Sequence, residues 1–358
     1  MDTPYVRIDA AVLRRNIDRM ADAVRARGLA LRPHVKTHKI PRIAQMQLAA
    51  GAVGLTVATI GEAEVFVAHG ADDVFIAYPL WLTPSRAERL AVLGASAHVA
   101  FGVDSPESAA HAAALLRAAA ADVEVLVEID SGHHRSGVRP EAAVAVAEAA
   151  RDGGLRVAGV FTFPGHSYAP GAAATAAEQE RTALLTASDA LEAAGFEVGR
   201  RSGGSTPSAL LTADGGATEV RPGVYVFGDA QQLALGRCEP ADIALTVAAT
   251  VVSRHAAEDG GARVVLDAGS KILGSDRPAW LEGFGAVDGL PGAVVVALSE
   301  HHATVAWPAG RALPDLGDVV ALVPNHVCLV LNLVDEVVAV SPDGAEERWP
   351  VSARGRNS

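Results

Sequence analysis

The feature that most restricts the fold of this chain is an alternation of two kinds of segment between residues 9 and 227. Alanine-rich stretches with charged residues at intervals, typical of helices, are followed by short runs of β-branched residues, typical of strands. Strands that alternate with helices usually pair in parallel, so the alternation predicts βα units and a parallel sheet. The expected strands are 29–33, 55–59, 74–77, 98–103, 123–129, 157–162, 197–201 and 219–227.

A helix is expected beside each of these strands. The first follows Asp9, a residue type that caps helix N-termini, and ends near Gly28. The others are expected at 41–50, 61–69, 84–93, 105–119, 140–152, 172–195 and 206–213. Eight strands and eight helices favour an α/β fold with a closed (β/α)8 barrel of the TIM type, although an open doubly wound sheet shows the same local alternation.

After about residue 235 the sequence changes to short β-rich runs separated by glycine, proline and aspartate. Strands are expected at 245–253, 263–266, 293–298, 319–323, 328–333 and 336–340. This spacing predicts an all-β C-terminal domain, either a small barrel or a sandwich. The expected organisation is a barrel over residues 9–235 and a β domain over residues 236–358, with residues 1–8 packing with the β domain.

Composition narrows the classes of function. Hydrophobic residues make up 50% and charged residues 20% of the 358 residues, which predicts a globular protein. The net charge of −12 disfavours nucleic acid or an anionic membrane as partner, so a small molecule is the expected ligand. The two cysteines, Cys238 and Cys328, are too few for a disulfide scaffold, and Cys238 is interpreted as structural. With no secretion signal and no long apolar stretch, we expect a cytoplasmic protein.

Two histidines and two lysines follow the first expected barrel strand, at His34, Lys36, His38 and Lys39. Active sites of such barrels lie at the carboxyl ends of the strands. A lysine in this position can be desolvated, which makes its amine a nucleophile able to form a Schiff base. An ordinary exposed basic loop has the same composition, so the motif alone leaves both interpretations open.

A loop rich in glycine and hydroxyl groups, Ser202–Ser208, follows the seventh expected strand. Its paired glycines let backbone N–H groups approach an anion, and loops at this point of a barrel often bind phosphate. It lacks the lysine of a Walker A loop and is not G-x-G-x-x-G, so the pattern does not support nucleotide hydrolysis. A plain glycine-rich turn is the alternative.

A third candidate lies in the β domain, where His326 and Cys328 are two residues apart. In an extended strand their side chains would face the same way and could bind one zinc ion, leaving other positions for water or substrate. A buried packing pair is the alternative, because a free cysteine behaves as a small hydrophobe. Three weaker segments place histidine, tyrosine or arginine at strand ends: 128–135, 165–168 and 299–302.

Taken together, residues 32–39, 202–207, 221–225 and 324–328 resemble the fold-type III pyridoxal 5′-phosphate (PLP) enzymes of the D-serine dehydratase and D-threonine aldolase family. The resemblance covers essentially the whole chain, and the motif Arg-Pro-His-x-Lys-Thr-His-Lys is specific. It implies an alanine-racemase-like barrel joined to a β domain, a homodimer, and an active site at the junction of the domains.

The resemblance also implies a role for individual residues. Lys36 matches the lysine that forms the Schiff base with PLP. The other cofactor contacts fall on a phosphate-binding turn of Gly204, Ser205 and Thr206, on Gly223, Val224 and Tyr225 opposite it, and on the loop residues His166 and Tyr168. Arg135 matches the residue beside the pyridine ring, with Arg221 as its rival, and an arginine there would disfavour protonation of the ring nitrogen.

His326 and Cys328 match the zinc pair of the dehydratase branch, whereas the aldolase branch usually has aspartate in place of Cys328, which suits Mn²⁺ or Mg²⁺. The resemblance therefore favours a lyase that converts D-serine or a related D-3-hydroxy amino acid to a 2-oxo acid and ammonia. Aldol cleavage to glycine and an aldehyde is the alternative, and a non-catalytic PLP carrier is a third possibility. One departure, His301 and Ala303 where relatives commonly have Glu and Gly, could alter the substrate pocket.

Overall fold

The computed structural model describes residues 1–212, 215–256 and 261–358. The chain forms two compact units, which are described separately. A barrel unit consists of Arg19–Lys36, Pro41–Gly223 and Gly355–Ser358, and a β unit consists of Met1–Asp18, Thr37–Ile40 and Val224–Arg354. Within the described residues, no helix is long and apolar enough to cross a membrane.

The barrel unit is built on eight parallel strands. They are β2 (Ala30–Leu31), β3 (Leu55–Val57), β4 (Asp73–Pro79), β5 (His98–Val103), β6 (Glu124–Glu128), β7 (Arg156–Phe161), β8 (Arg200–Gly203) and β9 (Glu219–Val220), in the order β2-β9-β8-β7-β6-β5-β4-β3. A parallel bridge between His34 and Thr56 joins the two ends of this order. The sheet therefore returns on itself, which confirms the barrel and rules out the open sheet.

Aromatic side chains fill the inside of this sheet. The rings of Phe75 on β4 and Phe161 on β7 meet edge to face, with their centroids 5.0 Å apart, and both are buried. Gly102 on β5 makes room for them, because a Cβ at this position would lie 2.6 Å from Cζ of Phe161. The β-branched and aromatic residues that predicted these strands thus supply the core that holds them together.

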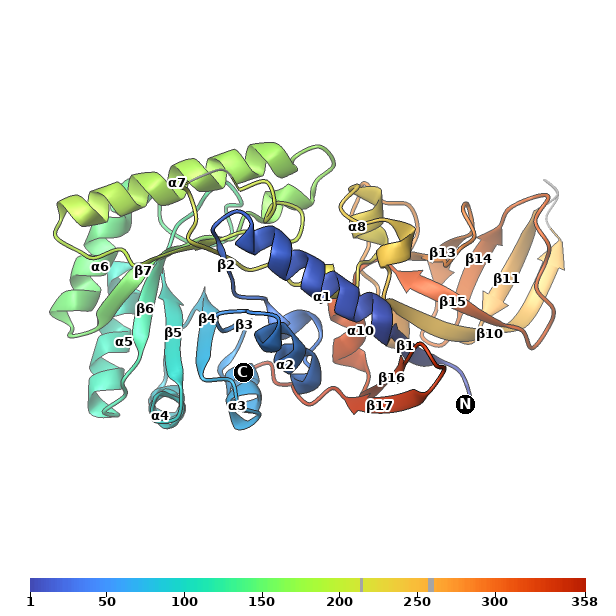
Figure 1. Ribbon diagram of the computed structural model, residues 1–358, viewed down its shortest axis with the longest axis horizontal. Helices are drawn as coiled ribbons and strands as arrows, with labels where there is room; N and C mark the ends of the chain where they lie inside the picture. Colours follow the sequence, from blue (N-terminus) through green and yellow to red (C-terminus); the bar gives the residue numbers. More distant parts are fainter. Residues whose placement is uncertain (213–214, 257–260) are drawn as a thin grey trace. The chain divides into compact units, whose positions relative to one another are not determined.

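Helices alternate with the strands, as Figure 1 shows for α4 to α7 outside β4 to β7. Their bounds are α1 (Ala10–Arg25), α2 (Pro41–Ala49), α3 (Ile60–Ala68), α4 (Pro84–Gly94), α5 (Pro106–Ala118), α6 (Ala143–Asp152) and α7 (Ala173–Ala193). As expected, α1 follows Asp9, whose Oδ1 accepts the N–H of Val12 at 3.0 Å. The chain then turns at Gly28 with φ of +67°.

The helix expected at 206–213 is wrong for its described residues, 206–212, which form turns instead. Ser208 explains the difference. Its Oγ accepts the N–H of Ser205 at 3.1 Å, and its carbonyl accepts the N–H of Leu211 at 2.8 Å, three residues on. These local bonds compete with the four-residue spacing of an α-helix. Residue 213 lies outside the described residues.

The β unit contains a closed barrel of six strands. These are β10 (Leu245–Ala256), β11 (Ala262–Leu266), β12 (Gly285–Val287), β13 (Val294–Leu298), β14 (Ala303–Trp307) and β15 (Val319–Pro324). Their order is β11-β14-β13-β12-β15-β10, and β10 pairs with β11 to close it. The sheet continues beyond β10 through β1 (Tyr5–Asp9), β16 (Glu336–Val340) and β17 (Glu346–Pro350). The strands β1, β12, β14 and β17 were not expected from the sequence, which predicted only that residues 1–8 pack with this domain.

The strand expected at 328–333 is wrong, because residues Val327–Leu333 form helix α10. Seven mostly apolar residues carry no periodicity that separates a buried strand from a buried helix. The helix is favoured at its start, where the carboxylate of Asp229 lies 3.4 Å from the N–H of Val327. His326 is therefore the residue that precedes a helix, and Cys328 lies in its first turn.

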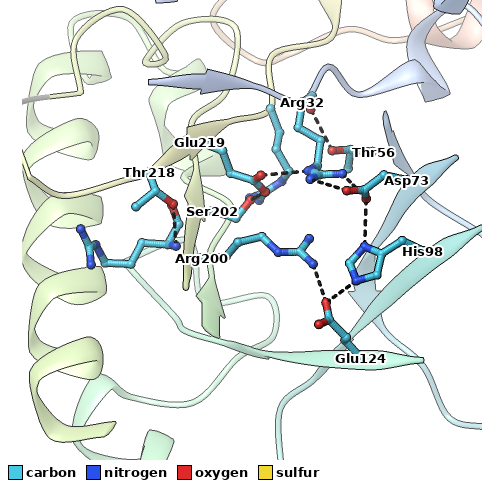
Figure 2. Close-up of polar contacts among 11 residues, drawn as sticks. Arg32, Thr56, Asp73, His98, Glu124, Arg200, Ser202, Thr218 and Glu219 are labelled. Carbon is cyan, nitrogen blue, oxygen red and sulfur yellow. Dashed lines mark hydrogen bonds and ion pairs between the residues drawn. The ribbon is translucent and has the colours of Figure 1, made fainter. Parts of the chain in front are cut away.

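Charged residues stand at the start of six consecutive barrel strands, and Figure 2 shows the contacts of Asp73, His98, Glu124, Arg200 and Glu219. They are Asp73, His98, Glu124, Arg156, Arg200 and Glu219, the first residues of β4 to β9. Arg32, which follows β2, binds Oδ1 of Asp73 at 2.6 Å and Oε2 of Glu219 at 2.9 Å. Oε2 of Glu124 accepts from Arg200 at 2.7 Å and lies 2.9 Å from Nε2 of His98. We call these seven residues the floor network, because six of them begin their strands and the guanidinium of Arg32, which follows β2, reaches the first residues of β4 and β9.

Candidate active site

Lys36 lies in a single 3₁₀ turn, Val35–Thr37, just after β2. Its side chain is half-buried, and its Nζ is 5.8 Å from the centroid of the Phe163 ring. The guanidinium of Arg135 lies 5.1 Å from the centroid of the same ring. The lysine and the arginine singled out from the sequence therefore meet around one aromatic side chain that follows β7.

Phe163 is a residue that the sequence analysis missed. Besides Lys36 and Arg135, its ring contacts His133 edge to face at 5.6 Å and Tyr168 at 6.4 Å between centroids. An aromatic ring attracts cations to its face and accepts edge contacts from other rings. Phe163 therefore brings together side chains from three loops at the carboxyl ends of strands. A phenylalanine next to a strand carries no local signal of such a role.

His34 is held in its neutral form. Its burial lowers the pKa well below the usual value, and the positive charges of Lys36, Arg221 and Arg135 lower it further. The backbone N–H donates to the carbonyl of Pro222 at 3.0 Å, while Nδ1 is buried with no hydrogen-bond partner in the described structure. A neutral imidazole in this setting resists protonation but is able to accept a hydrogen bond from a bound molecule.

The turn expected to bind phosphate, residues 204–206, has most of its donors already engaged. Gly204, at φ of +73°, donates its N–H to Oε2 of Glu180 at 2.8 Å. Ser205 donates its N–H to Ser208 and is buried. Oγ1 of Thr206 accepts the N–H of Gly223 at 3.2 Å, so this residue of the turn joins the two loops after β8 and β9.

The two arginines that compete for the place beside the pyridine ring differ in setting. Arg221 is buried between the rings of Phe75 and Phe161, and its burial lowers its pKa to about 10 despite nearby carboxylates. It donates to Oγ of Ser202 at 2.6 Å. Arg135 is exposed and lies over Phe163. Arg221 therefore serves the barrel interior, which leaves Arg135 the more accessible of the two.

The loop after β7 carries the remaining candidates of the barrel unit. His166 and Tyr168 lie in the 3₁₀ turn Gly165–Tyr168, and both are half-buried. Nε2 of His166 is 2.9 Å from Oε1 of Gln179 on α7, and its Nδ1 is buried without a partner in the described structure. The helix thus fixes the orientation of this imidazole.

In the β unit, Val224 and Tyr225 are buried in the 3₁₀ turn Val224–Val226. His326 and Cys328 lie at the start of α10, where the imidazole is close enough to the Cys328 sulfur for a hydrogen bond, although the strand that was expected to bring them together is absent. The thiol of Cys328 also lies 3.3 Å from Oγ1 of Thr37. The two side chains are therefore neighbours, but the period-two argument that predicted this is wrong, and their role as a metal pair stays a prediction.

Asp229 completes this pair and was missed in the sequence. Its Oδ2 lies 3.2 Å from Nδ1 of His326, and its Oδ1 caps α8 (Ala230–Ala234) by accepting the N–H of Gln232 at 2.8 Å. Burial opposes a charge on His326, but the negative Cys328 and Asp229 raise the pKa of the imidazole well above its usual value. Across the described residues, no group of three or more His, Cys, Asp and Glu side chains could hold a metal.

The segment 299–303 takes a structural position in the β unit. Glu300 forms an exposed ion pair with Lys271 at 2.8 Å, and the N–H of Ser299 donates to the carbonyl of His302 at 2.9 Å. His301 and His302 are exposed, and Ala303 is buried as the first residue of β14. The described residues bring no further metal ligand to these histidines.

Comparison with known protein families identifies two domains in the chain. Residues 8–231 match the family model described as "Alanine racemase, N-terminal domain", and residues 244–340 match one described as "Putative serine dehydratase domain". The chain belongs to the alanine racemase N-terminal domain family. This membership and the relatives below make it one of the PLP-dependent fold-type III proteins.

Relatives extend over the whole chain. It is 37% identical to D-threo-3-hydroxyaspartate dehydratase from Delftia sp. HT23, over 98% of this chain and 97% of that one, and the solved structure of that protein superposes with a TM-score of 0.89. It is 34% identical to D-threonine aldolase from Arthrobacter sp., over 99% and 93% of the two chains. A solved D-threonine aldolase from Filomicrobium marinum is 33% identical with a TM-score of 0.87, over 99% and 96%.

Proposed function

We propose that this protein is a PLP- and zinc-dependent dehydratase of D-serine or a related D-3-hydroxy amino acid, releasing a 2-oxo acid and ammonia. The observation that carries the proposal is the hydrogen-bonded pair of His326 and Cys328, with Asp229 holding the imidazole. The similarity to the Delftia dehydratase supports it, and a cysteine-to-alanine mutant of that protein has been solved in a metal-free form.

The residues of the barrel fit PLP. Lys36 offers an amine after β2, Arg135 offers a cation near it, and the hydroxyl of Thr206 lies where phosphate would be held. Gly165 leaves space for the ring of His133, since a Cβ there would come within 2.6 Å of the imidazole. When bound, PLP supplies the electron sink that stabilises negative charge at the substrate Cα.

The protein's own part in the reaction follows from these positions. Lys36 binds the cofactor and accepts the proton of the substrate Cα. Arg135, accessible over Phe163, supplies a fixed positive charge. His34 stays neutral through its burial and the neighbouring cations, so it accepts hydrogen bonds without adding positive charge. Phe163 keeps Lys36 and Arg135 on its ring, which limits the positions that each can take.

The pair in the β unit fits a soft divalent metal in the character of its donors. Because Asp229 engages Nδ1 of His326, Nε2 is the nitrogen left to bind a metal. A thiolate such as that of Cys328 binds zinc in preference to magnesium or manganese. Two protein ligands leave other positions for water or substrate, which is the arrangement of a catalytic zinc. Zinc bound there would supply Lewis acidity towards the substrate hydroxyl.

A second candidate is aldol cleavage of a D-3-hydroxy amino acid to glycine and an aldehyde. The similarity to D-threonine aldolases favours it. The thiol at Cys328 favours the dehydratase over it, because manganese and magnesium, the ions expected in the aldolase branch, prefer oxygen ligands. A PLP carrier without catalysis is the weakest of the three, because it would have no use for the His326 and Cys328 pair.

A product assay separates these functions. The zinc-loaded protein is incubated in turn with D-serine, D-threo-3-hydroxyaspartate and D-threonine, and pyruvate, oxaloacetate, 2-oxobutyrate and glycine are measured. A 2-oxo acid released with an equal amount of ammonia is the expected result. Glycine as the sole amino product would contradict the dehydratase, and no product from any D-amino acid would favour the carrier. We also propose a cytoplasmic homodimer, for which light scattering in solution gives the mass.

A further inference from the structure

A buried carboxyl group lies directly behind the turn at residues 204–206, and nothing in the proposed reaction uses it. Glu180, in the middle of α7, has an exposed fraction of 0%. Its Oε2 accepts the N–H of Gly204 at 2.8 Å. The contact extends to Gly203, where a Cβ would lie 2.7 Å from the carboxyl carbon of Glu180. The turn therefore rests on this carboxyl group.

The charge of Glu180 has little compensation. Arg221 is the charged group that acts on it, but the guanidinium is engaged by Ser202 and by the carbonyl of Thr162. The described structure gives Glu180 no ion pair, and the neighbouring Gln179 contacts His166 instead. Burial raises the pKa of Glu180 to about 7, although the Gly204 N–H, Arg221 and the hydroxyl of Thr212 all favour the ionised form.

We infer that protonated Glu180 supports, and ionised Glu180 opposes, binding of the PLP phosphate at residues 204–206. This inference rests on the proposed function, which puts the phosphate there. A phosphate monoester carries close to two negative charges above its second pKa of about 6. An ionised carboxyl group behind the same turn would repel it, whereas a carboxylic acid still accepts the hydrogen bond of Gly204 and adds no charge. Glu180 is thus a positioning residue that makes cofactor retention depend on pH.

The test compares the wild type with Glu180→Gln, which keeps an acceptor of the same size and cannot ionise. Dissociation constants of PLP are measured by titration of the apoprotein at pH 6 and pH 8.5. We expect affinity of the wild type to fall on the order of tenfold at the higher pH, and that of the variant to change much less. Both proteins keep Lys36, so any pH dependence that Lys36 gives to PLP binding is the same in the two and cancels when they are compared.

Two controls isolate the phosphate. Pyridoxal, which lacks the phosphate, is titrated in parallel, and wild type and Glu180→Gln should bind it with the same dependence on pH. Glu178→Gln removes one exposed charge from the same helix and should behave as the wild type. Equal pH dependence of PLP binding in the wild type and Glu180→Gln would overturn the inference, as would an effect of Glu180→Gln on pyridoxal equal to its effect on PLP.

Unfolding of the apoprotein gives a readout that needs no cofactor. The pKa of Glu180 is about 7 in the folded chain and near its usual 4.5 when unfolded, so the folded state binds the extra proton between these values. The stability that this proton contributes is full below pH 4.5 and is lost as pH rises through 7. Glu180→Gln should remove that loss, and an unchanged profile would overturn the inference. Wild type that binds no PLP at either pH would instead defeat the proposed function.

Discussion

The two ends of the barrel use charged residues in opposite ways. In the floor network Arg32 is matched by Asp73 and Glu219, each within hydrogen-bond distance. At the carboxyl ends of the strands, Nδ1 of His34 and Nδ1 of His166 are buried without partners in the described structure. In the floor network one atom shares this state, Nη1 of Arg200, although Nη2 of the same guanidinium pairs with Glu124. Paired charges fix the strands, whereas unmatched groups are available to a ligand. This division agrees with the general rule that such barrels hold stability at one end and chemistry at the other.

The largest effect on the chemistry is expected from Lys36→Ala. Loss of the amine should remove covalent attachment of PLP and lower turnover on the order of 10³-fold or more, because the variant loses both nucleophile and base. The unfolding midpoint of the apoprotein should stay close to that of the wild type, since the side chain is only half-buried. Absorbance of the cofactor, turnover and thermal unfolding measure the three quantities, and retained turnover would show that another group is the base.

The opposite behaviour is expected from the floor network. Arg32→Met leaves Asp73 and Glu219 without their shared cation in a buried place, and should destabilise the chain by about 3–5 kcal/mol. Arg181→Met is the matched control, because Arg181 pairs with Glu178 at the surface and its loss should cost less than about 1 kcal/mol. Denaturant unfolding measures both. If Arg32→Met instead lost cofactor affinity at unchanged stability, the contrast between the two ends would fail.

The metal pair extends the comparison to the β unit. Cys328→Ala should weaken zinc binding by more than about 100-fold, the upper range found for loss of groups that only support a ligand. The cofactor spectrum should remain. Cys238→Ala, which removes the other thiol, is the control and should retain the metal. Zinc content is measured after dialysis. Undiminished zinc in Cys328→Ala would show that Cys328 does not bind the metal and only packs in the β unit.

A smaller effect concerns acid stability. The pKa of His34 is lower in the folded chain than in the unfolded chain, because burial and the neighbouring cations oppose the imidazolium. The unfolded state therefore takes up the proton first, and stability is lost as pH falls below about 6.5. His34→Asn should lessen this loss, with about 1.4 kcal/mol for each tenfold difference in proton affinity. Unfolding at pH 5 and pH 7.5 measures it, and parallel curves would count against a neutral His34.

The sequence predicted most of the barrel because its signals are local. Strand 98–103 was located to the residue, since a short, mostly apolar run that starts at His98 and ends before Asp104 is sufficient to identify it. The apolar run at 327–333 has no such signal, and the contact of Asp229 with its first N–H could not be seen from 98 residues away. The same limit applies to Arg32, whose partner Glu219 is 187 residues distant. Contacts between side chains far apart in the sequence were therefore missed, whereas most helices and strands of the barrel were predicted.

The candidate site was only partly predictable for the same reason. Lys36, His326 and Cys328 were singled out by residue type and spacing together with the family resemblance, and their roles stay predictions. Phe163 and Glu180 have ordinary neighbours in the sequence, and only packing gives them significance. Glu180 sits in an alanine-rich helix, where a single acidic residue is usually a solvated one.

The carboxylate of Asp229 both caps a helix and holds the imidazole of a histidine. One oxygen begins helix α8 and the other holds the imidazole of His326. Glutamate would be too long to cap in the same way, and alanine would forfeit both bonds. Few replacements at this site can satisfy helix and imidazole together, so during divergence position 229 has little freedom to drift, and a change there would have to be accompanied by changes at its neighbours.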